Sequence, residues 1–401
     1  TPYGMVSVCP YSGAYPTGYG MYDVSTHGRA PKRFVTKTAT GFTHFHPSGI
    51  GNTKLFYNYV KVIPIRGASR PPMRWRLERE RARPGFYEAD LVPAGMHVEL
   101  TATPRAAFHR YTFQEETAPM IAVDLASGGI NCHGYTTRPS AGRVRRHTGG
   151  NTSGHVVMEG WPVYFCIQVD GGEVTTTLFR GREHLRGRRE IAFDEPGPQY
   201  ETPFGVVFRS RGAPDGRLEV RIGFSFRSVE RARANLRQVK GRPFEEVCEE
   251  SARLWTEHLG RIRVAGASAA DRTVFYSCLY HALIKPIDCA DESPLWSDVG
   301  PFYSDFATMW DQYKTSLPLM LTICPERAAG LVQSMLRTME EHGRFPTGYM
   351  MHDDIGRFDD QASALAHHTV ADAFYRGVEG VDWSRAVDVL AGALKWGRGA
   401  E

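Results

Sequence analysis

The sequence predicts a two-part fold in which an antiparallel β-sandwich is followed by amphipathic helices. Over residues 1–228, short segments rich in β-branched and aromatic residues alternate with clusters of Gly, Pro, Asn and Asp. This spacing is typical of a sandwich rather than of βαβ units. At Ser228 the pattern changes to charged, helical sequence, and beyond it apolar residues recur with a helical period. The 41 glycines and 25 prolines also favour a part rich in strands and loops.

The expected strands are short segments, each bounded by turn residues. They alternate apolar and polar residues or run β-branched and aromatic, which predicts strands that bury at least one face. The segments are 55–65, 85–93, 97–104, 107–113, 120–126, 163–169, 173–179, 204–210 and 218–226.

The helical part begins with a charged linking element over residues 228–262, broken at Gly241-Arg242-Pro243. Later segments place apolar residues on one helical face, which predicts that this face is buried. These sets are Val274, Phe275, Cys278, Leu279, Ala282 and Leu283; Leu331, Val332, Met335, Leu336 and Met339; and Val387, Leu390, Ala391 and Leu394. Cys278 and Cys324 are expected to be small core residues. The predicted domains are a β-sandwich at 1–228, a helical linker at 229–264 and a helical domain at 265–401.

Charge and cysteine content limit the classes of function. A net charge of +4 on 401 residues is too small to predict nucleic-acid binding. The seven cysteines form no C-x-x-C pair, so neither a zinc site nor a disulfide framework is predicted. No stretch is long and apolar enough to span a membrane, and no signal peptide is recognised.

Two stretches are locally basic, RVRR at 143–146 and RGREHLRGRRE at 180–190. The second interleaves its arginines with Glu183, His184 and Glu190. This pattern favours the solvated end of a hairpin.

The segment at 305–327 carries the strongest functional signal. It places Trp310 and Asp311 directly ahead of an apolar run that ends in CPER at 324–327. A carboxylate beside an indole stabilises a core poorly, because desolvating an unpaired charge is costly. The same pair suits a sugar, which offers an apolar face for stacking and a rim of hydroxyls for hydrogen bonds. The alternative is a core Trp beside an Asp311 that caps a helix.

A second candidate is the loop GFTHFHPSGIG at 41–51. Its three glycines and Pro47 give a tight, irregular backbone, and His44 and His46 lie on one side if the chain is locally extended. The alternative is a sandwich hairpin with two surface histidines.

The order of these segments resembles glycoside hydrolase family 92, the calcium-dependent exo-α-mannosidases. The resemblance spans nearly the whole chain, and its segments occur in the family's order. They are PYGMVSVCP at 2–10, GFTHFHPSGIG at 41–51, FYSCLYHALIKP at 275–286, MWDQYKTSLPL with CPER at 309–327, and VADAFYRG at 370–377. The resemblance implies a β-sandwich followed by a partial (α/α)6 barrel, with residues 265–401 as the first part of that barrel.

The resemblance also implies a pocket for a terminal mannose. The family's counterpart of the 41–51 loop reaches over the barrel toward the sugar, and the Trp-Asp pair lies in the monosaccharide pocket. A satisfied core histidine is the alternative for the helical His281. The substrate-binding residues implied are His44, His46, Trp310, Asp311 and His281, with Tyr280 and Asn52 as further candidates.

The expected catalytic acid departs from the family pattern. Inverting hydrolysis needs an acid and a base roughly 6.5–9.5 Å apart, and the family's acid is a Glu before the Ala-Asp-Ala helix. Here no Glu occurs between Glu341 and Glu379. Either Asp360 or Asp359 replaces the acid, or the acid is absent and Gln361 lies nearby. A third interpretation is that these aspartates only cap the following helix.

A missing acid is tolerable when the leaving group is a phosphate, because a stable anion departs without a proton. Cleavage of mannose-1-phosphodiesters is therefore an alternative to hydrolysis of ordinary mannosides.

The family's general base lies in a Gly-x-Asp-Asp-x-Gly-x-x-Ser-Ala-Trp motif and its calcium ligands largely in a Glu-x-Asn-x-x-Gln-like stretch. Nothing similar to either follows Asp372. Ca²⁺ is therefore a cofactor implied by the family, with no ligand assignable in this chain. We expect these 401 residues alone neither to hydrolyse mannosides nor to bind calcium tightly.

The leading hypothesis is an exo-acting, inverting α-mannosidase that removes terminal α-linked mannose from glycans and, as family members usually are, is secreted or periplasmic. A non-catalytic carbohydrate-binding protein is the alternative from another class. A scaffold with purely architectural similarity is the third, because folds host many functions.

Overall fold

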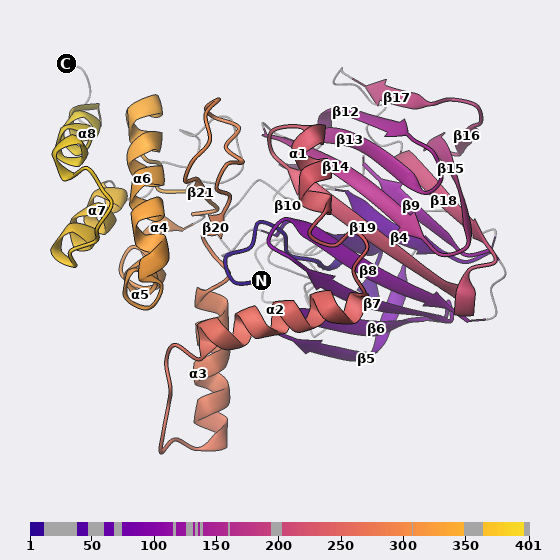
Figure 1. Cartoon of the computed structure of the whole chain (residues 1–401), viewed down its shortest axis with the longest axis horizontal. Helices are drawn as coiled ribbons and strands as arrows, with labels where there is room; N and C mark the ends of the chain where they lie inside the picture. The colour runs from indigo at the N-terminus through magenta and orange to yellow at the C-terminus, as the bar shows by residue number, and fades with distance from the viewer. Residues whose placement is uncertain are drawn as a thin grey trace. The chain divides into compact units, whose positions relative to one another are not determined.

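A computed structural model describes most of the chain (Figure 1). The described residues are 1–11, 38–46, 60–67, 74–114, 118–125, 131–132, 135–136, 139–158, 161–193, 203–306, 308–348 and 364–396. The chain divides into two compact units. The first comprises Thr1 and Met5–Trp255, and the second comprises Pro2–Gly4 and Thr256–Glu401. The predicted linker at 229–264 therefore contains the point at which the units divide.

The first unit is built on two large antiparallel sheets, which confirms the predicted sandwich. The seven-stranded sheet has the order β1-β3-β4-β9-β18-β15-β16. Its strands are β1 (Cys9–Tyr11), β3 (Gly41–Thr43), β4 (Lys61–Ile65), β9 (Met120–Asp124), β15 (Glu173–Arg180), β16 (Glu183–Leu185) and β18 (Phe204–Arg211).

The ten-stranded sheet has the order β17-β12-β13-β14-β19-β8-β7-β6-β5-β2. Its strands are β2 (Thr38–Ala39), β5 (Trp75–Arg83), β6 (Phe86–Val92), β7 (Met96–Ala102), β8 (Ala106–Phe113), β12 (Pro139–Arg146), β13 (Asn151–Met158), β14 (Trp161–Asp170), β17 (Glu190–Phe193) and β19 (Arg217–Ser225). The described part of the strand region also contains a small pair, β10 (Asn131–Cys132) and β11 (Tyr135–Thr136), and a 3-10 turn, η2 (Pro214–Gly216).

Alternation along the strands fixes which side chains form the core. In β14, for example, Trp161, Val163, Phe165 and Ile167 are almost fully buried and the intervening Pro162 and Tyr164 are half-buried. Burying an aromatic or branched side chain of this size contributes roughly 1.5–3 kcal/mol. The largest fully buried side chains of this unit are Trp75, Trp161, Tyr111, Phe42, Phe45, Phe108, Phe165 and Phe208.

One helix and most of a second belong to this unit, which ends at Trp255. Ser228 caps α1 (Val229–Leu236), since its side chain accepts a hydrogen bond from the Arg231 amide. The second, α2 (Phe244–Leu259), follows the Gly241 turn that the sequence marked as a break. Both helices bury apolar side chains in one cluster with strand residues, comprising Ala106, Phe108, Cys166, Ala232, Leu236, Val239, Phe244, Val247 and Cys248.

The second unit contains α3 (Ala269–Ala282), the short pair β20 (Ile287–Asp288) and β21 (Tyr303–Ser304), α4 (Met309–Gln312), α5 (Ser316–Ile323), α6 (Pro325–His342), α7 (Leu365–Tyr375) and α8 (Trp383–Trp396). In this unit α6 packs against α5, α7 and α8 (Figure 1). The apolar face predicted for α6 is confirmed, because Leu331, Val332, Met335, Leu336 and Met339 are each at most 2% exposed.

Two of the predicted helical faces are wrong in detail. In α3, Val274 is 64% exposed and Cys278 is exposed, whereas Leu279 and Leu283 are buried. In α8, Val387 and Leu394 are exposed, and the buried positions are Ala386 and Ala393. Small alanines allow close approach to a neighbouring helix, and Val387 and Leu394 lie on the exposed side of α8.

The second unit also includes the residues Pro2–Gly4. The Tyr3 side chain is 1% exposed. Its backbone N–H donates to the carbonyl of Leu283 at 2.9 Å, and its carbonyl accepts from the amide of Asp288 at 2.8 Å. The guanidinium of Arg327 lies 5.1 Å from the centre of the Tyr3 ring. Among the described helices, none is long and apolar enough to cross a membrane.

Candidate active site

The predicted indole and carboxylate lie on the short helix α4. Met309 anchors this helix, being 0% exposed and donating its backbone N–H to the carbonyl of Thr347 at 3.0 Å. Trp310 is half-buried and Asp311 is exposed. Thr308 is the N-cap residue of this helix, so Asp311 stands in the first turn and not at the N-cap position. This arrangement leaves the carboxylate accessible beside a partly covered indole.

A buried ion pair supports the chain that enters α4. The Lys285 ammonium lies 2.5 Å from a carboxylate oxygen of Asp305, and their side chains are 7% and 1% exposed. Asp305 has φ 65°, a left-handed conformation that Asp and Asn tolerate better than most residues. Asp305 directly follows β21, and Lys285 lies two residues before β20. The pair therefore ties the two arms of this hairpin together just ahead of α4.

The CPER segment braces the same hairpin. Pro325 occupies the first turn of α6, where its missing N–H costs nothing. The Arg327 guanidinium donates to Asp288 Oδ2 at 2.5 Å, and the Tyr303 hydroxyl donates to the same oxygen at 3.4 Å. Burial, and next the Asp288 charge, raise the pKa of Tyr303, so this hydroxyl stays protonated and acts as a donor. The CPER residues thus stabilise the β20–β21 hairpin that precedes the candidate site.

The other helical candidates lie in the last turn of α3. His281 is exposed, and its ring lies 5.7 Å from that of the half-buried Tyr280. The alternative of a core histidine therefore does not describe His281 in this structure. Its predicted contact with the sugar stays a prediction.

The paired histidines of the 41–46 segment lie inside the sandwich unit. His44 is 0% exposed, and its Nε2 lies 2.9 Å from Nε2 of His109. The Nδ1 of His109 in turn lies 2.8 Å from the Tyr111 hydroxyl. Burial, and next the neighbouring His44, hold the pKa of His109 well below its usual value, and burial raises the pKa of Tyr111. These buried hydrogen-bonded partners favour a structural role for His44. Its predicted sugar contact stays a prediction.

His46 has a different environment. It is 7% exposed, and its Nε2 lies 2.9 Å from the Cys9 thiol and 3.3 Å from the Thr43 hydroxyl. Burial raises the pKa of Cys9, so the thiol stays neutral. Asn52 lies outside the described residues.

The acid candidates Asp359, Asp360 and Gln361 also lie outside the described residues, so their roles stay predictions. The helix that follows them, α7, has Ala364 at its N-cap position, and Ala364 makes no side-chain hydrogen bond that caps the helix.

Sequence reasoning missed two groups, the Lys285–Asp305 pair and the His109–Tyr111 partners of His44. Lys285 lies in the segment 275–286 and Asp305 opens the segment 305–327, yet nothing in their spacing pairs them. For His109 the only signal was a polar residue in a predicted strand, and the strand pairing that brings it to His44 is not visible in the sequence.

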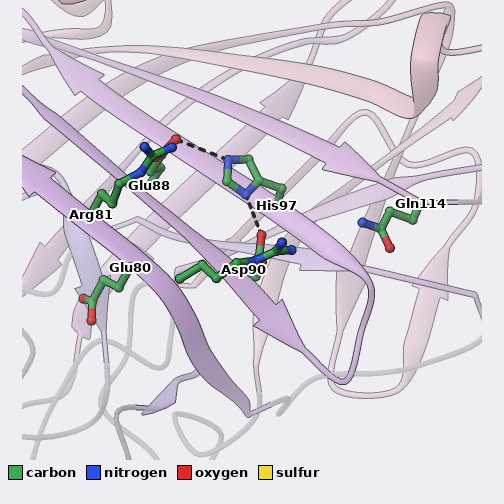
Figure 2. A pocket seen from close by; sticks show the side chains of 7 residues that line it. Glu80, Arg81, Glu88, Asp90, His97 and Gln114 are labelled. Carbon is green, nitrogen blue, oxygen red and sulfur yellow. Dashed lines mark hydrogen bonds and ion pairs between the residues drawn. The ribbon is translucent and has the colours of Figure 1, made fainter.

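A cavity of about 530 Å³ lies on the ten-stranded sheet, over β5, β6 and β7. Figure 2 shows its lining residues Arg79, Glu80, Arg81, Glu88, Asp90, His97 and Gln114. Arg79 pairs with Asp90 and Arg81 with Glu88, while Nδ1 of His97 lies 2.7 Å from Asp90. Burial alone would raise the pKa of Asp90, but hydrogen bonds from His97 and Arg79 outweigh it and lower that pKa. Opposite charges are thus matched, which favours an ion-pair network over a catalytic site.

The described residues do not fit the calcium ion that the family implies. Two groups of potential metal ligands have atoms within 4.8 Å of one another, and each contains a nitrogen or sulfur ligand. They are His258, Cys324 and Glu326, and Glu88, His97 and Glu99. Ca²⁺ prefers six to eight oxygen ligands. We therefore derive no catalytic step through calcium.

Comparison with known families agrees with this architecture. The sequence model described as Glycosyl hydrolase family 92 N-terminal domain matches residues 1–225. The model described as Glycosyl hydrolase family 92 catalytic domain matches residues 231–395. Sequence and fold thus place the chain among glycoside hydrolases that join a β-sandwich to a helical catalytic domain. Within that class, the chain belongs to glycosyl hydrolase family 92.

Solved structures show the same fold. A family GH92 α-mannosidase from Bacteroides thetaiotaomicron superposes with a TM-score of 0.79 at 20% identity, covering 98% of this chain and 54% of that one. A GH92 inverting mannosidase from the same organism gives 0.74 at 20% identity, covering 97% and 51%. These likenesses confirm the predicted fold class, a β-sandwich followed by part of an (α/α) barrel.

A curated relative from Arthroderma benhamiae, described as an uncharacterized secreted glycosidase, is 24% identical over 299 residues. The match covers 69% of this chain and 39% of the relative. The chain therefore spans well under two thirds of the relatives it matches.

Proposed function

We propose that this chain contributes the sandwich and the first helices of an exo-acting, inverting α-mannosidase that removes terminal α-linked mannose from glycans. Two observations on relatives support this substrate and this stereochemistry. One solved relative is an inverting mannosidase, and another solved GH92 α-mannosidase is in complex with mannoimidazole.

The observation that carries the proposal is the geometry of α4 inside the match to the catalytic domain. A half-buried Trp310 stands next to an exposed Asp311 on a helix anchored by Met309. An indole covers the apolar face of a pyranose, and a carboxylate accepts hydrogen bonds from two neighbouring hydroxyls. The Lys285–Asp305 pair fixes the chain that leads into this helix, which limits the motion of both groups.

The absence of a Glu between Glu341 and Glu379 favours a second candidate within the same family. In ordinary mannoside hydrolysis, Asp360 or Asp359 would protonate the leaving oxygen. In cleavage of a mannose-1-phosphodiester, no acid is required because the phosphate leaves as an anion, and Gln361 would stand near its place.

We also propose that the whole protein is calcium-dependent and exported. Calcium would bind two adjacent hydroxyls of the sugar and assist ring distortion, with ligands outside the residues of this chain. The secreted description of the Arthroderma relative supports export.

The decisive experiment compares two substrates on the full-length parent protein. An aryl α-mannoside and a mannose-1-phosphate diester are supplied in parallel, and the anomer released first is identified by NMR. We expect release of β-mannose, from inversion, and loss of activity with a chelator. Preference for the aryl mannoside removes the phosphodiester candidate. Release of α-mannose refutes inversion, and absence of activity on both substrates refutes the enzyme.

Calorimetry tests the carbohydrate-binding alternative on the 401-residue chain. Mannose is titrated with and without a chelator, and aryl mannoside hydrolysis is measured in the same samples. We expect no hydrolysis. Binding that survives the chelator, together with an inactive full-length parent, would support a non-catalytic lectin-like protein instead.

A further inference from the structure

The loop that joins the two large sheets at one edge of the sandwich is rich in arginine. It runs from the end of β15 through β16, the edge strand of the seven-stranded sheet, to β17, the edge strand of the ten-stranded sheet (Figure 1). Arg182, Arg186, Arg188 and Arg189 are all exposed on it. Gly187, with φ 80°, makes the tight turn between the two strands.

Neighbouring elements extend this charge. Arg143 and Arg145 are exposed on β12, opposite Ala192 and Glu190 of β17. The amide of Arg146 donates to the carbonyl of Arg189 at 2.8 Å, which brings the loop against β12.

Helix α1 adds Arg233, which is also exposed. Burial, and next the charges of Arg233 and Arg145, lower the pKa of His147 at the end of β12. The helix and the strand therefore place positive charge on one continuous area. We call it the arginine surface: Arg143, Arg145, Arg182, Arg186, Arg188, Arg189 and Arg233.

Among the described residues, few negative charges lie on the segments of this surface. Glu183, Glu190 and Glu230 lie on the same segments, so the seven arginines leave a local excess of +4, equal to the formal net charge of the whole chain. Within the described parts of the chain, one ion pair reaches these arginines, between Arg143 and Glu190 at 3.3 Å. The remaining guanidinium groups face solvent.

Exposed guanidinium groups select a particular ligand chemistry. Their planar donors match phosphate, sulfate and carboxylate groups in a bidentate manner. A row of them binds a polyanion more strongly than a single anion, because each neutralised site releases condensed counterions. Single-stranded nucleic acid would additionally need aromatic side chains for base stacking, and the 180–190 loop contains no Phe, Tyr or Trp.

We propose that the arginine surface is a binding site for an anionic polysaccharide, one that carries repeated phosphate or sulfate groups. The sequence favoured a solvated hairpin end for these stretches, and the exposed end of the β15–β16 hairpin, at Arg180 to His184, agrees with that prediction. The binding site goes beyond the glycosidase activity and does not depend on it, since no residue of α4 takes part. It would hold the protein on a charged glycan polymer.

The test uses the 401-residue chain and four probes: dextran sulfate, a phosphorylated mannan, an unsubstituted mannan and duplex DNA. We expect both anionic polysaccharides to bind at about 50 mM NaCl and the unsubstituted mannan not to bind. If four phosphates or sulfates are neutralised, raising NaCl to about 200 mM should weaken binding on the order of 100-fold, by the coefficient known for nucleic-acid polyanions. The dextran sulfate and phosphorylated mannan arms separate sulfate from phosphate as the preferred group.

A matched pair of triple variants locates the site. Arg182→Ser/Arg186→Ser/Arg188→Ser should weaken dextran sulfate binding at least about tenfold. The control, Arg209→Ser/Arg211→Ser/Arg217→Ser, removes the same charge from three exposed arginines. In the β15–β18 register Arg211 lies opposite Glu173, which is at the other end of β15 from Arg180. The control should leave most of the affinity intact, and both variants should keep the melting temperature because all six side chains are exposed.

Three results would overturn the proposal. Equal weakening by the two variants would show binding by net charge alone. Failure of dextran sulfate and phosphorylated mannan to bind at low salt would show that the surface does not bind anionic polysaccharides. Stronger binding of duplex DNA than of either anionic polysaccharide would assign the surface to nucleic acid.

Discussion

Breaking the buried Lys285–Asp305 ion pair is expected to destabilise the helical unit by about 3–5 kcal/mol, the usual cost of leaving one buried charge uncompensated. At 2.5 Å the direct attraction is about 7 kcal/mol for an effective dielectric constant near 20. Most of this is offset by desolvation of the two charges. Asp305→Asn is the informative change, because Asn has the same shape and tolerates the left-handed backbone at this position.

The double variant Lys285→Met/Asp305→Asn removes both charges. It should be less destabilised than the sum of the single variants by about 1–3 kcal/mol. Amide hydrogen exchange over the peptide Ile287–Ser304 measures the free energy of local opening, and it does not require the two units to unfold together. A cost below about 1 kcal/mol for Asp305→Asn, or strictly additive single variants, would refute the view that this pair holds the hairpin ahead of α4.

Three further outcomes are expected. The pKa of His109 is depressed in the folded state, so the unfolded chain binds more protons below about pH 6.5 and the free energy of unfolding should fall as pH drops through that value. His109→Gln should flatten this part of the plot of unfolding free energy against pH. An unchanged plot would contradict a buried, neutral His109 imidazole. Arg221 is 6% exposed and donates to Asp170, Glu219 and two backbone carbonyls; Arg221→Met should cost about 2–4 kcal/mol in urea unfolding, whereas Arg217→Met on the same strand should stay within about 0.5 kcal/mol. In the full-length parent, Asp311→Asn should lower kcat/KM for the aryl mannoside by at least about 100-fold without changing the melting temperature, and normal kinetics in this variant would exclude Asp311 from the sugar pocket.

Strands β6, β7, β8, β9, β14, β15, β18 and β19 were predictable because each carries its own evidence, whereas β5, β12 and β13 were not predicted. A segment such as 163–169 alternates apolar and polar residues, and burial of one face requires that alternation in any sheet. Helix α6 was predictable for the same reason, with five apolar residues in register on a long segment. Where these elements lie along the sequence can be predicted from the local sequence alone.

Details that depend on the neighbouring element were not predictable. The apolar residues of α8 admit two faces, and the structure chooses the one with Ala386 and Ala393, since small side chains fit against an adjacent helix. The same limit applies to the site. Trp310 and Asp311 are visible as a motif, but Lys285 and Asp305 are 20 residues apart, and only the β20–β21 pairing brings them together.

The attachment of Tyr3 to the helical unit makes the sandwich an insertion within that unit. The polypeptide leaves the helical fold after Gly4 and rejoins it only at Thr256. During synthesis on the ribosome, the residues that contact Tyr3, namely Leu283, Asp288 and Arg327, would emerge long after Tyr3 itself. A shortened chain that starts at Met5 should therefore keep a folded sandwich unit. Its helical unit should become less stable, although that unit lies far along the sequence from the deletion.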